Sequence, residues 1–214
     1  MQTTFLSSLK LDDGQLAQIV LDQFENKKYL TISENFKLLE NFLLSQKPLK
    51  SLCELLSLDW ESFVNCFVSL FHKSFVNEHQ FNGIEDNERL EFLGDTVIAL
   101  YITERLMNKF PLKKEGDLSR FRNQLVCREA LADLAKSIGL KKMILLGKGE
   151  FKRDGFNNDS LLADCFEALL GSIYITFGKV KAWKFLDIII LEHEKNIKKS
   201  FFDLEKLKIT DVKS

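Results

Sequence analysis

The scarcity of residues that interrupt regular structure is the feature that most constrains this chain. Only 2 prolines and 10 glycines occur in 214 residues. A sandwich or barrel of many short strands needs numerous turns rich in these residues, so the composition disfavours such folds and favours long helices. With 45% hydrophobic and 29% charged residues, the chain has the composition of a globular protein with one domain or two small ones.

Apolar residues recur at helical spacing along most of the chain. Two short amphipathic helices are predicted before Pro48, over Gln15–Phe24 and Asn35–Leu44. Denser helical segments follow over Ser51–Leu56, Trp60–Ser74, Glu88–Lys109, Leu118–Ile138, Ser160–Phe177 and Val180–Lys199. The polar stretch Gly147–Asp159 has the glycine, asparagine and aspartate content of a mobile loop. We therefore predict an all-α fold with a helical N-terminal extension (1–48), a main helical domain (49–200) and a C-terminal tail or linker (201–214).

The cysteines and the apolar segments bear on the compartment. Four cysteines are scattered without a C-x-x-C pair, so neither a zinc site nor a disulfide framework is predicted. Reduced thiols are typical of the cytosol. The N-terminus lacks the features of a signal peptide, and no apolar stretch is long enough to span a bilayer. We expect a cytoplasmic protein, or one in the nucleus or an organelle if the source is eukaryotic, with no membrane partner.

Carboxylates on two otherwise apolar helices carry the clearest chemical signal. Helical spacing places Glu88, Glu91 and Asp95 on one face of a segment whose other faces are apolar. From Ser160 to Gly178 the only charged residues are Asp164 and Glu167, three positions apart and therefore on one face. Buried carboxylates are unfavourable unless a cation or a hydrogen-bond network compensates them.

Two interpretations of these acids remain open at this point. Four inward carboxylates without a matching internal lysine or arginine provide the oxygen ligands that Mg²⁺ prefers. Alternatively, each acid caps a loop, pairs with an arginine from elsewhere or faces solvent, as most single helical acids do. Because the pattern occurs on two helices, the metal interpretation is favoured.

The same residues resemble the ribonuclease III family. Asn87–Asp95 resembles the signature segment of that family, and Asp164–Gly171 resembles its second acidic motif. Further matches follow the family order at His72–Phe75, Glu115–Ser119, Leu145–Glu150 and Ser160–Asp164. The resemblance extends over roughly residues 52–199.

The resemblance implies a ribonuclease III-type endonuclease domain, all-α and homodimeric. Such a domain is a metal-dependent endoribonuclease that hydrolyses phosphodiester bonds in both strands of double-stranded RNA, leaving 5′-phosphate and 3′-hydroxyl ends with short 3′ overhangs. The implied catalytic, metal-binding carboxylates are Glu91, Asp95, Asp164 and Glu167, with Mg²⁺ as cofactor and Mn²⁺ as a substitute. Glu88 and Glu115 match acids that border the same cleft. Phe92 matches an aromatic residue that inserts into the partner subunit.

Cationic and polar residues near these motifs are candidates for RNA contacts. They are Lys73, Lys113, Lys114, Ser119, Arg120, Arg122 and Asn123. Bacterial family members usually continue into a double-stranded-RNA-binding domain, for which residues 201–214 leave no room. Two alternatives follow from the resemblance: the sequence is a fragment cut in the linker, or the protein acts without that module. An alternative is a catalytically silent ribonuclease III-like protein with an RNA-binding or ribosome-associated structural role, which the presence of all four acids disfavours. A di-iron enzyme would need Glu-x-x-His pairs, which the chain lacks.

The overall charge is compatible with an RNA partner once the acids are considered separately. A formal net charge of −1 is unusual for a nucleic-acid-binding domain. Without the six proposed cleft acids, the formal charge of the remaining chain is +5. We therefore expect RNA binding that is salt-sensitive and weak without a separate RNA-binding domain.

Overall fold

The protein is helical throughout the part of the chain that its computed structural model describes, namely residues 53–54, 56–59, 62–63, 65–79 and 85–203. The α-helices are α6 (Lys73–His79), α7 (Glu88–Lys109), α8 (Glu115–Leu125), α9 (Arg128–Ser137), α10 (Lys148–Lys152) and α11 (Asp159–Ile197), and three 3₁₀ helices are η1 (Asn65–Leu70), η2 (Leu140–Lys142) and η3 (Gly155–Asn157). Within these residues the only β-pairing is an isolated bridge between Phe71 and Leu145. The all-α prediction is thus confirmed. The predicted extension, 1–48, and its two helices lie outside the described residues.

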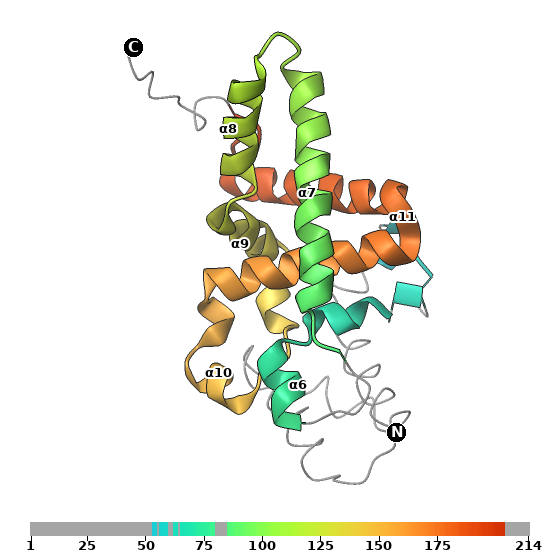
Figure 1. The fold of residues 1–214 in the computed structure, drawn as a ribbon, viewed down its shortest axis with the longest axis vertical. Coiled ribbons are helices and arrows are strands. Elements are labelled where there is room, and N and C mark those ends of the chain that lie inside the picture. Colours follow the sequence, from blue (N-terminus) through green and yellow to red (C-terminus); the bar gives the residue numbers. More distant parts are fainter. Residues whose placement is uncertain (1–52, 55, 60–61, 64, 80–84, 204–214) are drawn as a thin grey trace.

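Helix α11 reverses direction at Gly178. Its φ of 79° and ψ of 177° interrupt the helix, and this left-handed φ is accessible to glycine without a Cβ penalty. The first arm (159–177) and second arm (179–197) lie side by side, with α7 crossing both (Figure 1). The rings of Phe166 and Phe185 stack between the arms with centroids 6.0 Å apart. The two helices predicted here therefore form one folded-back unit.

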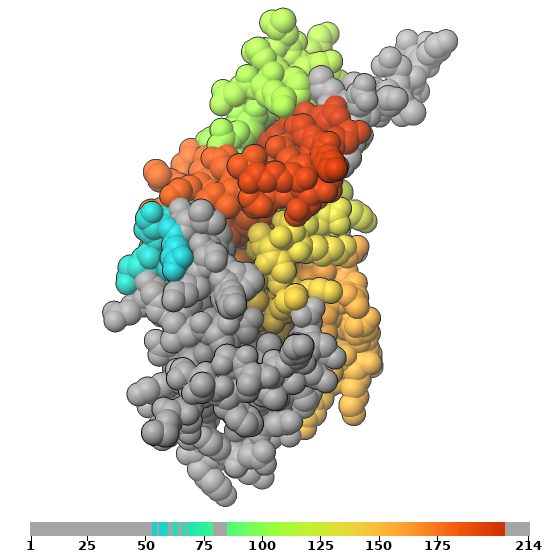
Figure 2. Space-filling view, turned by 180° about the vertical axis from the view of Figure 1, so that it is seen from behind, coloured from blue at the N-terminus to red at the C-terminus, as the bar shows by residue number. Residues whose placement is uncertain are grey.

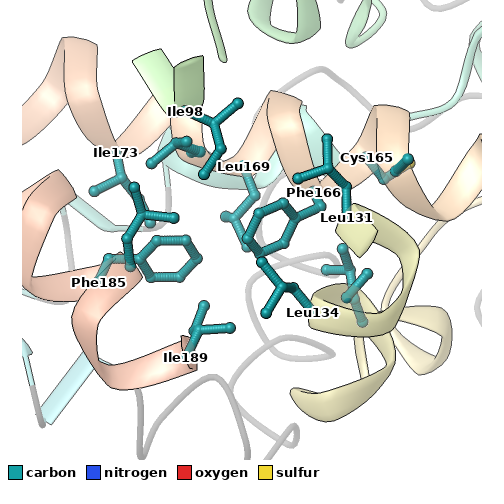
Figure 3. Close-up of a cluster of buried hydrophobic side chains, with 14 of the residues drawn as sticks. Ile98, Leu131, Leu134, Cys165, Phe166, Leu169, Ile173, Phe185 and Ile189 are labelled. Atoms are coloured by element: carbon teal, nitrogen blue, oxygen red, sulfur yellow. The ribbon is translucent and has the colours of Figure 1, made fainter. Parts of the chain in front are cut away.

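The hydrophobic core lies where α7, α9 and both arms of α11 meet (Figure 3). Its buried side chains include Ile98, Leu131, Leu134, Phe166, Leu169, Ile173, Phe185 and Ile189. Each contributes about 1.5–3 kcal/mol when fully buried. The second arm of α11 forms part of the back face of the molecule, where its atoms are red in Figure 2.

The core also explains the apolar character of α11. By length and composition alone, this helix is the one among the described residues that could cross a membrane. However, 61% of its most apolar 18-residue window is buried inside the protein. Packing in the core therefore accounts for its hydrophobicity.

Two predicted helices are each divided in the structure. The helix predicted over Leu118–Ile138 is wrong as a single element, since α8 ends at Leu125 and α9 begins at Arg128. The break lets α8 pack on α7 while α9 packs on α11. The helix predicted over Trp60–Ser74 is also interrupted, because Leu145 N–H donates to Leu70 and His72 N–H donates to Leu145 in an extended connection.

The segment predicted as a loop, Gly147–Asp159, contains regular structure instead. It forms α10 and η3, whose Phe151 and Phe156 rings meet edge to face at 5.0 Å. Gly147 N–H donates to Ser74 Oγ at 3.0 Å, which fixes the start of α10 on α6. The two phenylalanines, both packed against the core, explain why this polar sequence folds.

The crossing of α7 and the first arm of α11 is so close that glycine is required on both helices. A Cβ on Gly94 would overlap the carbonyl oxygen of Glu167, and a Cβ on Gly171 would overlap that of Leu90. Backbone therefore meets backbone at this crossing. The acids predicted from the sequence flank it on both helices.

We predict that Gly171→Ala destabilises the protein by about 3 kcal/mol or more, because overpacking against a backbone carbonyl cannot be relieved by a rotamer change. The gain in helix propensity, at most about 1 kcal/mol, does not offset this. Gly116→Ala is the matched control, since a Cβ there meets nothing within 4 Å. Urea unfolding measures both changes, and equal stability of the two variants would contradict the close crossing.

Candidate metal centre

Three of the four predicted catalytic carboxylates converge beside the helix crossing. Glu91 projects from α7, and Asp164 and Glu167 project from the first arm of α11. One carboxylate oxygen of each lies within 4.8 Å of the others, and all three side chains are half-buried. An all-oxygen set at this spacing, contributed by two rigid helices, fits a hard divalent cation such as Mg²⁺.

The electrostatics of the cluster also fit a cation site. Burial, followed by the charges of Asp95, Glu91 and Asp164, raises the pKa of Glu167 to about 8. Burial and the neighbouring Asp164 raise the pKa of Glu91. The pKa of Asp164 is raised by burial as well, against the opposing charge of Arg128. The three carboxylates therefore lack sufficient positive charge of their own, which a bound divalent cation would supply.

Asp95 stands apart from the other three acids. It is exposed on α7, one turn after Glu91, and does not belong to the group whose oxygens lie within 4.8 Å of one another. Its charge nevertheless acts on Glu167, as the strongest of the neighbouring acids. The arrangement is therefore three converging ligands with a fourth carboxylate at the rim.

Asn87 holds the two acidic helices in register, a role that the sequence analysis did not assign. This buried residue precedes α7, and its Nδ2 donates to Ser69 O at 3.2 Å and to Cys165 Sγ at 3.3 Å. Its carbonyl accepts the N–H of Glu91 at 2.9 Å. Since Cys165 adjoins Asp164, Asn87 links the start of α7 to the side chain that follows Asp164 on α11. An asparagine directly before a predicted helix was the available signal.

The two secondary acids occupy different places. Glu88 begins α7 next to the cluster, where Lys73 Nζ lies 2.8 Å away and holds the pKa of Glu88 below its usual value. Glu115 begins α8 at the tip of the α7–α8 hairpin (Figure 1) and accepts a hydrogen bond from Ser119 at 2.7 Å. From Glu91 to the end of α7 the helix is about 27 Å long. The structure therefore does not bring Glu115 to the cluster of the same chain.

The predicted RNA contacts are divided in the same way. Lys73 lies near the cluster, and its charge opposes the raised pKa of Glu91. The others lie on the hairpin turn or on α8: Lys113, Lys114, Ser119, Arg120, Arg122 and Asn123. Within this group Arg120 forms an ion pair with Asp117, and Arg122 is half-buried.

Phe92 is a large apolar side chain in an exposed position. It is 80% exposed on α7, directly after Glu91. Leu100 and Met107 are also exposed and lie within one face of the same helix at helical spacing. This strip of α7, defined by Phe92, Leu100 and Met107, is left uncovered by the described part of the chain.

Comparison with known proteins gives consistent similarities. Residues 67–193 match the family model described as Ribonuclease-III-like. Ribonuclease 3 of Staphylococcus aureus is 44% identical over 122 residues, which cover 57% of this chain and 50% of that protein. The chain thus spans about half the length of the curated relatives it matches.

Solved structures show the same similarity. A structure of the nuclease domain of ribonuclease III from Campylobacter jejuni, described as flexible in a region involved in dimer formation, is 33% identical. The match has a TM-score of 0.60 and covers 70% of this chain and 99% of that one. A second structure of that nuclease domain matches with the same identity and TM-score over 72% of this chain.

We predict that Mg²⁺ affinity rises about tenfold per pH unit between pH 6 and pH 8 and then levels off, because the cation displaces one proton from Glu167. The raised pKa also means that the folded, metal-free protein holds a proton which the unfolded chain has lost. Its stability should therefore fall as the pH rises from about 4.5, the usual pKa of a glutamate side chain, to about 8.

Isothermal titration calorimetry at several pH values measures the first effect, and thermal unfolding without metal measures the second. Glu167→Gln should flatten both profiles, whereas Glu192→Gln, at an exposed acid on the second arm of α11, should not. A Mg²⁺ affinity that is constant from pH 6 to pH 8 would contradict the assignment.

Proposed function

The chain belongs to the ribonuclease-III-like family, and on this premise we propose that it is a metal-dependent endoribonuclease that cleaves double-stranded RNA. The observation that carries the proposal is the convergence of Glu91, Asp164 and Glu167 from two helices. These ligands suit a divalent cation, for which Mg²⁺ is the proposed cofactor and Mn²⁺ the proposed substitute.

The four acids divide into two roles in the proposed reaction. Bound metal would supply Lewis-acid stabilisation of the phosphodiester oxygens and a nucleophilic water at neutral pH. Glu91, Asp164 and Glu167 would hold the metal between the helices, and Asp95 would supply further negative charge at the rim. Water attacks phosphorus and the bond from phosphorus to the 3′ oxygen breaks. The products are a 5′-phosphate and a 3′-hydroxyl, and no protein nucleophile is required.

We infer that the active form is a homodimer. The strip of Phe92, Leu100 and Met107 presents apolar side chains along α7, beginning next to the metal ligand Glu91, as a self-complementary interface would. Glu115 is far from the cluster of its own chain, so an acid at this position reaches a centre only in a second copy. Dimer formation is also named for the Campylobacter jejuni nuclease domain. Two centres in one dimer would cut both strands and leave short 3′ overhangs.

We predict that purified protein cleaves a long RNA duplex with Mg²⁺ or Mn²⁺ and that Glu167→Gln lowers the rate by at least about 10²-fold, since one of three ligands is lost. Gel analysis with end labelling measures the rate and the end groups. Glu192→Gln serves as the control for loss of an acid. Duplex binding without cleavage under either metal would instead favour the catalytically silent alternative.

We predict that Phe92→Glu dissociates the dimer, because it places a charge in the apolar strip at its most exposed aromatic residue. Light scattering coupled to size exclusion measures the mass. Val180→Glu is the matched control, since Val180 is 81% exposed on the turn of α11 and does not belong to the strip. A wild-type monomer at micromolar concentration, or a dimer unaffected by Phe92→Glu, would refute this interface.

A further inference from the structure

An arginine that was not among the predicted RNA contacts lies beside the carboxylate cluster. Arg128 is the first residue of α9. At the other end of this helix, Lys136 Nζ pairs with Asp159 at the start of α11, 2.7 Å away. Lys136 Nζ also lies 3.4 Å from Asp133, so this side chain reaches back along α9, and α9 packs directly on α11.

The packing of α9 on α11 brings Arg128 near Asp164. The charge of Arg128 acts on the carboxylate of Asp164. Figure 3 agrees, since Leu131, one turn after Arg128, lies near Cys165 and Phe166. Arg128 therefore stands at the edge of the cluster on the side of α9.

Among the cations near Asp164, Arg128 is the one whose charge can act on an external anion. Of the cations that oppose the raised pKa of Asp164, Arg128 acts most strongly, ahead of His72 and Lys73. Burial lowers the pKa of His72, which leaves its ring largely neutral at pH 7. Lys73 pairs with Glu88. Arg128 is exposed and takes part in none of the ion pairs between described residues.

Helix stability does not explain an arginine at this position. The first turn of a helix carries partial positive charge, so a cation there is unfavourable by about 0.3–1 kcal/mol. Glu129, the next residue, is the type of side chain that the dipole favours. The arginine is thus placed against the local preference, and an external anion is the partner that would use it.

We propose that Arg128 is an RNA-binding residue that holds a backbone phosphate adjacent to the one cleaved, an inference that rests on the proposed endoribonuclease function. A guanidinium can donate two parallel hydrogen bonds to a phosphate, which fixes both its position and its orientation. Beside Asp164, this contact sets the register of the strand relative to the ligands of the cation.

The test is duplex binding by the full chain in the Glu167→Gln background, with Mg²⁺ and a fluorescent RNA duplex of about two helical turns. Arg128→Ala should weaken binding about 5- to 10-fold and make the plot of log K against log salt shallower by about 0.7–0.9, the loss of one phosphate contact. Arg128→Lys should restore most of the slope, since its charge remains. Lys195→Ala, which removes a cation paired with Glu192, should change neither quantity.

The outcomes separate this inference from the proposed function. Cleavage by the wild type, with unchanged affinity and salt slope in Arg128→Ala, would overturn the inference and leave the function standing. A wild type that neither binds nor cleaves duplex RNA would overturn both. Arg128→Ala should melt at the same or a slightly higher temperature than its parent. A lower melting temperature, with no recovery of binding in Arg128→Lys, would assign Arg128 a structural role and overturn the inference.

Discussion

The backbone contact between α7 and the first arm of α11 is the constraint on which the site depends. Gly94 and Gly171 allow the helices to approach until the main chain of one touches the main chain of the other. Only at this separation do carboxylates from both helices come within 4.8 Å. A cation site tolerates errors of about 0.5 Å in ligand position, less than one methyl group would impose. The acidic motifs are therefore functional only together with the glycines that adjoin them.

The same contact places three acids where burial opposes their charge. The fold buries Glu167 beside other acids, which disfavours its ionised form and raises its pKa to about 8. Elsewhere in the described fold, apolar residues fill the core, and Asn87 satisfies its amide through Ser69 and Cys165. A rule that is followed in the core and broken at one cluster indicates a functional site. In the metal-free protein these buried acids are unfavourable, and a bound cation would compensate their charge. Cation binding should therefore stabilise the folded protein.

How much the sequence could predict differs between the fold and the site. The bounds of α7 were predicted as the structure has them, because Asn87 and Pro111 enclose an uninterrupted apolar pattern. The break between α8 and α9 was not predicted, since neither glycine nor proline marks Val126 or Cys127 and tertiary packing decides it. For the site, helical spacing identified the acids. Spacing on one helix cannot give distances between two, so the separate position of Asp95 required the crossing itself. Arg128 could not be identified from the sequence, because only the packing of α9 on α11 places it near the acids.

This arrangement explains how a chain with a nearly neutral net charge can bind RNA. Without a cation, the cluster presents negative charge to any approaching phosphate and competes with it for Arg128. A divalent cation held by the cluster would add two positive charges near Arg128, which would reverse the local field and free Arg128 to act on an external anion. Cation and RNA should then bind cooperatively, and linkage requires that each increase the affinity for the other by the same factor. A chain with a formal charge of −1 can in this way bind a polyanion, because the relevant charge is that of the metal-loaded surface.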